Sequence, residues 1–379
     1  MRVYALGTHA TYGCANRGAC CRAGWDIPVE PVLVPLIRAA VAAGRLPSEP
    51  VPLVTEPPLP PGAGAVLART PDGACAFHDA RAHRCLVQVS EGEAALPSSC
   101  RHFPRVVLRD GRGVFVVLSH FCPTAADLLW RDDLPLAIIE SPRAFPAGDG
   151  LEGLDATDTL PPLLHPRMLL DLPAYAAWES HVIRAFGADE APSAVLRALS
   201  AHVEVLRRWE PGHGPFAAAL ETLPSWPRAS GAAGPAGAED AAPTEALSAA
   251  SMLARYEEVR AAIPEDLRPP APSWRPGSRE LLERPAHRRA VNRFLAAHAF
   301  ANWCAYQGQG LRTILRGLEA VLAVLCVETG RLLGEVRHDD LSDRGARRLV
   351  TEAIRVTDLR LVHQADAVVL ARRWSRAER

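Results

Sequence analysis

Apolar residues recur at i, i+3 and i+4 spacing through most of the second half of the chain, which is the period of an amphipathic α-helix. The pattern predicts helices over residues 175–186, 193–209, 248–263, 287–303 and 311–336. The most apolar run, LEAVLAVLCV at residues 318–327, is too short to cross a bilayer, which needs about 20 apolar residues. We therefore expect a helical domain that has no contact with a membrane.

The first half of the chain carries shorter and more varied patterns. Residues 31–44 predict a short helix that ends at Gly44, and residues 124–130 predict another helix with Thr124 as its N-cap. Between them, residues 105–120 hold two β-branched runs around a glycine-containing turn, which is typical of a β-hairpin. The expected fold class is mainly α: an N-terminal cysteine-rich metal-binding module with a small β-hairpin, followed by a helical domain.

Length and composition divide the chain further. At about 150 residues per domain, 379 residues predict two domains, which we place at residues 1–130 and 131–379. Within the second domain, residues 227–246 are rich in Gly, Ala and Pro and predict a low-complexity loop. The stretch 271–278 is a proline-rich break between helices.

Charge and targeting signals narrow the class of protein. The 42 basic residues are all arginine and face 43 acidic ones, for a net charge of -1, which argues against a nucleic-acid binder. Without lysine, no Schiff-base or lysine-base chemistry is available. The first residues, MRVYALGTHATYGC, lack the continuous apolar segment of a signal peptide, so we expect a cytoplasmic protein.

Cysteines are distributed very unevenly. Of nine cysteines, seven lie in the first 122 residues: Cys14, Cys20, Cys21, Cys75, Cys85, Cys100 and Cys122. Cys304 and Cys326 lie in apolar helical segments, where cysteine acts as a small buried hydrophobe. A reducing cytosol disfavours structural disulfides, so the N-terminal cluster predicts metal or redox chemistry.

The spacing of the seven cysteines bears on the kind of metal centre. They do not form the CxxC pairs of a zinc ribbon, so they are expected to converge only through folding. Thiolates select zinc, copper(I) or iron–sulfur clusters, and seven exceed the four ligands of one zinc ion. We expect the adjacent side chains of Cys20 and Cys21 to diverge, which favours two metals or a polynuclear cluster.

Four histidines are interleaved with these cysteines: His78, His83, His102 and His120. The pairs Cys100-x-His102 and His120-x-Cys122 are spaced to place two ligands on one side of a strand. Histidine is a common metal ligand, but whether any of the four is one stays open at this point.

Ordered motifs over about 120 residues resemble a known family. CANRGACC resembles the CxxCGxCC start of the YkgJ-type cysteine-cluster family, a zinc- or iron-chelating domain. The segments CCRAGWDI, GEAALPSSC, CRHFPR and SHFCPTAADLL are similar to its flagellin lysine N-methylase (FliB-like) branch. Arg17 stands where the family pattern has its second cysteine, and His78 stands in place of the usual leucine.

The resemblance implies that all seven N-terminal cysteines are metal ligands, holding an iron–sulfur cluster or zinc. It also implies a long helical region and methyl transfer from S-adenosylmethionine to lysines of a protein substrate. The residues themselves show no Rossmann-type glycine-rich turn, no GxSxG, no P-loop and no HExxH, so they indicate metal binding alone. A non-catalytic metal-binding or partner-docking module, or a structural zinc site, remains the alternative. The oligomeric state stays open.

Overall fold

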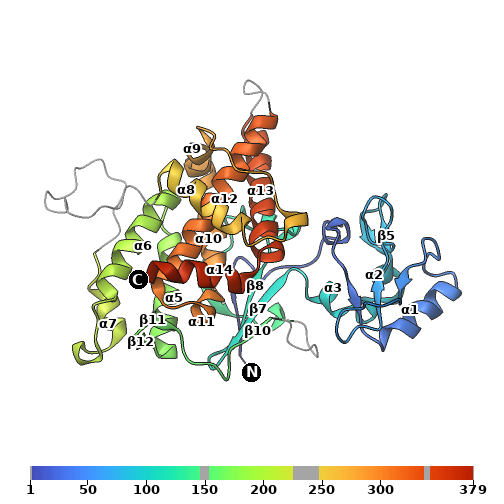
Figure 1. Cartoon of the computed structure of the whole chain (residues 1–379), viewed down its shortest axis with the longest axis horizontal. Coiled ribbons are helices and arrows are strands. Elements are labelled where there is room, and N and C mark those ends of the chain that lie inside the picture. The colour runs from blue at the N-terminus through green and yellow to red at the C-terminus, as the bar shows by residue number, and fades with distance from the viewer. Residues whose placement is uncertain (1, 146–152, 225–246, 337–341, 379) are drawn as a thin grey trace.

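The computed structural model describes residues 2–145, 153–224, 247–336 and 342–378, so the predicted loop at 227–246 lies outside the described residues. Most of the regular structure is helical, which confirms the helical part of the expected fold class. Figure 1 shows a small lobe carrying α1, α2, α3 and β5 beside a larger body of helices. We call residues 13–103 the cysteine lobe and residues 172–378 the helical body.

A five-stranded mixed sheet joins the lobe to the body, in the order β10-β7-β8-β1-β9. Its strands are β1 (Val3–Leu6), β7 (Arg105–Asp110), β8 (Gly113–Leu118), β9 (Ile138–Glu140) and β10 (Leu154–Asp155). The predicted hairpin is confirmed as the antiparallel pair β7–β8. It does not stand alone in the cysteine module, however, because β8 also pairs in parallel with β1 and β7 pairs with β10. Strands from both sides of residue 130 thus share one sheet.

The cysteine lobe is inserted between β1 and β7 and is built from short elements. Its strands are β2 (Pro28–Val29), β3 (Leu53–Val54), β4 (Ala65–Leu67), β5 (His78–Asp79) and β6 (Arg84–Cys85). Its helical segments are η1 (Cys20–Arg22), α1 (Leu33–Ala42), α2 (Leu86–Glu91), η2 (Glu93–Ala95) and α3 (Ser98–His102). The helix expected at residues 31–44 is confirmed as α1, and Gly44 follows it with φ +71°, a conformation that favours glycine at a helix end.

The helical body confirms all five predicted helices. They are α5 (Leu172–Phe186), α6 (Pro192–Leu206), α8 (Ala249–Arg260), α10 (Pro285–Ala299) and α12 (Leu311–Glu335). Around them lie α7 (Phe216–Glu221), α9 (Ser278–Glu283), α11 (Cys304–Gln307), α13 (Asp343–Asp358), the π-helical segment η7 (Leu359–Gln364) and α14 (Ala367–Trp374). The remaining short elements are β11 (Leu163–His165), β12 (Met168–Leu169), η3 (Pro142–Ala144), η4 (Pro211–His213), η5 (Glu265–Leu267) and η8 (Ser375–Glu378).

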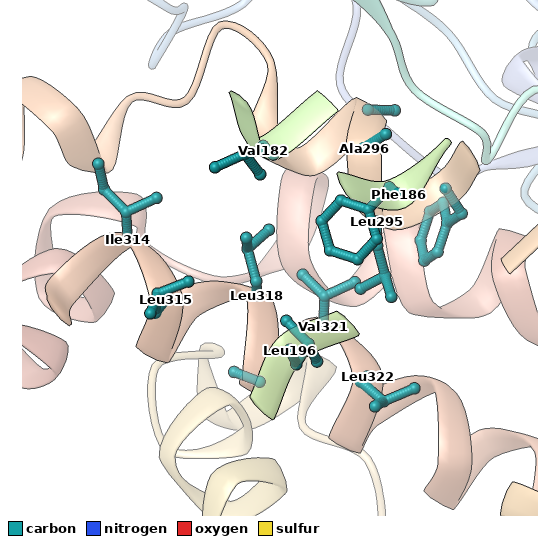
Figure 2. Packing of buried hydrophobic residues seen from close by; sticks show 14 of the residues in the cluster. Val182, Phe186, Leu196, Leu295, Ala296, Ile314, Leu315, Leu318, Val321 and Leu322 are labelled. Atoms are coloured by element: carbon teal, nitrogen blue, oxygen red, sulfur yellow. The ribbon is translucent and has the colours of Figure 1, made fainter. Parts of the chain in front are cut away.

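The core of the body forms around α12, the longest helix. Leu318 and Leu322 of this helix are fully buried and lie among residues of α5, α6 and α10, such as Val182, Leu196 and Leu295 (Figure 2). Burial on all sides explains why this helix is apolar around most of its circumference. No helix among the described residues has both the length and the apolar character needed to cross a membrane.

One predicted helix start is wrong. The helix expected at residues 124–130 is α4 (Pro123–Leu128), and its N-cap is Cys122 rather than Thr124. Pro123 explains the shift, because its fixed φ and missing N–H suit the first turn of a helix. As a result, the last of the seven N-terminal cysteines sits at the junction of the sheet and α4.

Candidate functional site: a thiol-lined cavity and a buried histidine network

Each of the seven N-terminal cysteines lines at least one of two adjoining cavities. We call these the inner and outer thiol cavities. The inner cavity, of about 250 Å³, is lined by Cys20, Cys21, Cys75, Cys85 and Cys100. The outer cavity, of about 330 Å³, is lined by Cys14, Cys20, Cys21, Cys85, Cys100 and Cys122. Four cysteines are therefore shared by both. None of the nine cysteines forms a disulfide.

Short elements of the lobe bring these thiols together. Cys20 and Cys21 lie on the single turn η1, and the backbone N–H of Cys75 donates to the carbonyl of Cys21 at 2.7 Å. Cys85 ends β6 and is the N-cap of α2. Cys100 lies in α3. Folding thus places thiols that are far apart in the sequence on the walls of two adjoining cavities.

The expectation that Cys20 and Cys21 point apart is wrong. Their Sγ atoms are only 4.0 Å apart. On a 3₁₀ turn, successive side chains are separated by about 120° rather than by the near-opposite directions of a strand. Two thiolates on one tetrahedral zinc ion, with Zn–S of about 2.3 Å, would lie about 3.8 Å apart. The pair therefore fits a single ion as well as two.

The protonation of the metal-free thiols follows from burial and from their crowding. A hydrogen bond from Cys21 lowers the pKa of Cys20 to about 7, and the same bond raises the pKa of Cys21. Burial raises the pKa of Cys75 to about 11. Burial, followed by the neighbouring Cys85 and Cys20, raises the pKa of Cys100 well above the usual range. Without a cation, Cys20 ionises more readily than Cys75 and Cys100, which burial and then the neighbouring thiols keep neutral.

The four interleaved histidines take different places. His83 lines the outer cavity and His102 lines the inner one. His78 lies beside the lobe's thiols, and its Nε2 atom is buried without a hydrogen-bond partner among the described residues. That atom lies 2.5 Å from where a Cβ at Gly18 would be, so only glycine fits between Cys14 and Cys20 at this point.

Neither His-x-Cys pair lies on a strand, which corrects that expectation. Cys100 and His102 both belong to the helix α3. His120 follows β8 and is 1% exposed, but its ring points to His9 rather than to the thiols, with their Nε2 atoms 3.2 Å apart. Cys122, two residues on, instead contacts the Tyr12 hydroxyl at 3.6 Å.

His120 belongs to a buried polar network that sequence reasoning missed. Asp358 Oδ2 accepts a hydrogen bond from the His120 backbone N–H, and its Oδ1 lies 2.8 Å from His298 Nε2. Burial raises the pKa of Asp358, but the facing histidines outweigh this and hold its pKa at about 2. Burial lowers the pKa of His120 to about 4. The network thus holds a carboxylate in the interior, surrounded by imidazoles.

The network reaches the thiols through an aromatic bridge formed by Trp25, Phe103, Phe121 and His363. His363 lines the inner thiol cavity, and its Nε2 lies 2.7 Å from Ser119 Oγ on the body side. Its ring centroid is 4.7 Å from that of Trp25 in the lobe. Asp358 directly precedes the π-helical segment η7, and His363 lies within it. This rare conformation recurs at functional sites.

No periodicity in the sequence predicts this network, because its members come from separate elements, at positions 9, 119–120, 298, 358 and 363. A single signal was available: histidine and aspartate at apolar positions of otherwise amphipathic helices. The seven cysteines, in contrast, were visible through their concentration in one third of the chain.

The geometry stops short of a formed metal site. In the part of the chain that the structure describes, no three Cys, His, Asp or Glu side chains lie close enough together to hold one metal ion. The fold and site thus define a mainly α-helical protein with a cysteine-lined lobe. Comparison with family models, curated proteins and solved structures finds no match to this chain.

Proposed function

We propose that the chain binds a metal centre, an iron–sulfur cluster or zinc, through the thiols of its cysteine lobe and Cys122. The observation that carries the proposal is that seven cysteines, spread between residues 14 and 122, line two adjoining cavities. Four of these cysteines line both cavities. Soft thiolates select these metals. Cation binding would also offset the burial and the mutual repulsion that keep Cys75 and Cys100 protonated, so protons would be released as the metal enters.

The donor set fits such a group in number and in chemistry. Seven thiols exceed the four ligands of one zinc ion. Two adjoining cavities offer room for two ions or for a polynuclear cluster. The 4.0 Å separation of the Cys20 and Cys21 sulfurs is within reach of the spacing on a single ion.

Protein-lysine methylation with S-adenosylmethionine stays a prediction of the motif resemblance. Binding of S-adenosylmethionine to the metal-loaded protein is the measurement that would support this activity. The non-catalytic alternative, a metal-binding or partner-docking module with a structural zinc site, predicts tight metal and no cofactor binding.

The test is elemental analysis of protein purified without oxygen, with iron, zinc and labile sulfide quantified and the visible spectrum recorded. Iron with sulfide and a brown colour would indicate a cluster, and stoichiometric zinc in colourless protein would indicate a zinc site. The double variant C20S/C21S should lose most of the bound metal, because both thiols line both cavities.

Cys326→Ala is the matched control. This thiol is fully buried in α12, outside both thiol cavities, so metal content should not change. Full metal retention by C20S/C21S would overturn the ligand assignment. Wild-type protein that neither holds metal nor takes it up on anaerobic reconstitution would overturn the proposal itself.

A further inference from the structure

Cys20 and Cys21 are neighbours in space as well as in the sequence. Their Sγ atoms lie 4.0 Å apart and share a hydrogen bond. Among the described residues, no second pair of cysteine sulfurs makes such a contact, and none of the nine cysteines forms a disulfide. Because a disulfide bond is about 2 Å long, these two sulfurs need to approach by only about 2 Å. This pair is therefore the one in the lobe that starts nearest to a disulfide.

The pair is also within reach of a small oxidant. Both cysteines are partly exposed and line the outer thiol cavity, whose wall includes the exposed Cys14. Cys326, in contrast, is fully buried in α12. Reversible oxidation of a thiol needs access to solvent and a second thiol that captures the sulfenic acid before it is oxidised further. Cys20 and Cys21 meet both conditions.

The backbone around the pair favours a bond that is easily opened again. The Cα atoms of neighbouring residues are about 3.8 Å apart, which is less than the roughly 4.4–6.8 Å usual for bridged cysteines, so the bond would be strained and readily reduced. Closing it would distort η1, in which the Ala23 N–H donates to the Cys20 carbonyl at 3.3 Å. Gly18 and Gly24, with φ of +67° and +74°, flank the turn and give the chain freedom to take up the change.

The same turn is connected to the rest of the thiol site. The Cys75 backbone N–H donates to the Cys21 carbonyl at 2.7 Å, so distortion of η1 would displace Cys75 as well. Two thiolates on one zinc ion would lie about 3.8 Å apart, close to the 4.0 Å of this pair, so a bound ion would not separate the sulfurs. A sulfur in a disulfide is not a thiolate and does not bind metal. Oxidation and metal binding at this pair therefore exclude each other.

We propose that Cys20 and Cys21 form a redox-sensitive dithiol that hydrogen peroxide converts to a disulfide and that thiol reductants restore. The thiolate of one cysteine attacks a peroxide oxygen, the O–O bond breaks, and hydroxide leaves and takes up the thiol proton as water. The second sulfur attacks the resulting sulfenic sulfur, so that an S–S bond forms and a second water leaves. Two thiols and one peroxide thus give one disulfide and two waters. Release of metal on oxidation rests on the proposed function, whereas formation of the disulfide does not.

Tryptic digestion isolates this pair from every other cysteine. Cleavage after Arg17 and Arg22 releases residues 18–22, GACCR, which contain both thiols and no third one. The full-length protein as purified is treated with one equivalent of hydrogen peroxide, blocked with N-ethylmaleimide under denaturing conditions, digested and analysed by mass spectrometry. We expect this peptide to be unblocked and lighter by two hydrogens, and the other cysteines to be blocked as free thiols. Dithiothreitol, added before blocking, should restore both thiols.

The single variants C20S and C21S are the matched controls. Each leaves one thiol of the pair without its partner, so peroxide should produce a sulfenic acid that dimedone traps. Dimedone adducts on residues 18–22 should rise severalfold over wild type, and the light peptide should be absent. A disulfide that joins wild-type residues 18–22 to another peptide, or a peptide with both thiols still blocked after peroxide treatment, would overturn the proposal.

Metal measured in the same samples separates this proposal from the metal centre. Where the protein holds metal, a chromophoric chelator should detect its release in step with the light peptide. Protein that takes up no metal and still forms the light peptide would support the dithiol and overturn the metal centre. Metal-loaded protein whose pair stays reduced in peroxide would support the metal centre and overturn the dithiol.

Discussion

The cysteine lobe and the helical body bury their apolar residues to very different extents. The main core cluster of the lobe contains 11 buried residues, among them Ile37 and Phe77. The cluster centred on α12 contains 60 of the described residues, and 52 of these belong to the body. The lobe also relies on two- and three-residue strands, whereas the body uses helices of up to 25 residues.

This difference teaches where a metal centre would matter for folding. A small core supplies little hydrophobic stabilisation, and domains with few buried residues usually depend on a metal or on disulfides. The lobe has six thiols and no disulfide, and Cys122 adds a seventh thiol at its edge. Folding of the lobe should therefore depend on its bound metal, whereas the body should fold without a metal.

The largest expected effect is the response to metal removal. Chelation should unfold the cysteine lobe and leave the helical body folded, because metal binding contributes folding free energy only where the ligands lie. Hydrogen exchange resolved by segment measures this directly: protection in α1 and β4 should be lost, and protection in α12 should persist. If α1 keeps its protection in metal-free protein, the lobe is stable on its own core and the proposed coupling is wrong.

A core truncation should affect only the body. Leu322→Ala removes a fully buried side chain of α12 and should cost about 2–5 kcal/mol in the free energy of unfolding, measured by urea titration with far-UV circular dichroism. Metal content should not change. Leu160→Ala is the matched control, because this leucine is 75% exposed and should cost less than about 0.5 kcal/mol. Loss of metal from the Leu322 variant would show that body and lobe fold as one unit.

The same contrast explains how much of the fold could be predicted from the sequence. The five long helices were predictable because their buried apolar residues recur with a 3.6-residue period, even in α12, which is buried around most of its circumference. The lobe's short strands were not predicted, since elements such as β5 contain only two residues and carry no period. The place of the hairpin at the centre of a sheet depends on pairing with β1, about 110 positions away, which no local pattern encodes.

The candidate site divides in the same way. The seven cysteines were found because rare residues were concentrated in one region. The direction of Cys20 and Cys21 was misjudged because it depends on a 3₁₀ turn that their spacing does not specify. The network of His9, His120 and Asp358 was missed because only the tertiary fold brings these residues together, around a π-helical segment.

Acid should weaken the body by a smaller amount. Burial, with the neighbouring His202, lowers the pKa of His181 to about 4, and His181 Nε2 lies 3.1 Å from His202 Nδ1. Since the unfolded chain takes up this proton near pH 6.5, stability is full above that pH, falls as the pH drops towards 4 and then levels off. We expect this histidine to account for on the order of 2 kcal/mol of that loss.

Urea titrations at pH 7 and pH 4.5 measure this slope. His181→Gln, which keeps a polar side chain but cannot take up a proton, should reduce the slope, and the part that remains includes the buried His120, whose pKa is also lowered to about 4. His213→Gln changes an exposed histidine and should leave the slope as it is. An unchanged slope in the His181 variant would place the acid-sensitive group elsewhere.

The smallest expected effect concerns the contact between the two regions. Trp25 of the lobe packs against Phe121 at a centroid distance of 5.4 Å and against His363 at 4.7 Å. Each such aromatic contact contributes about 0.5–1.5 kcal/mol. Trp25→Ala should loosen the lobe from the body and speed hydrogen exchange around Phe121 and in η7 by roughly tenfold, which corresponds to about 1.4 kcal/mol.

Trp25→Phe keeps an aromatic ring and should restore most of this protection, which separates the ring contact from a general loss of packing. Metal content and the protection of α12 should be the same in both variants, because Trp25 supplies no thiol and lies outside the core of the body. Unfolding of either region in Trp25→Ala would mean that the aromatic bridge couples their folding. The contrast between a metal-dependent lobe and an independent body would then no longer hold, since loss of metal would be transmitted through His363 to the network around Asp358.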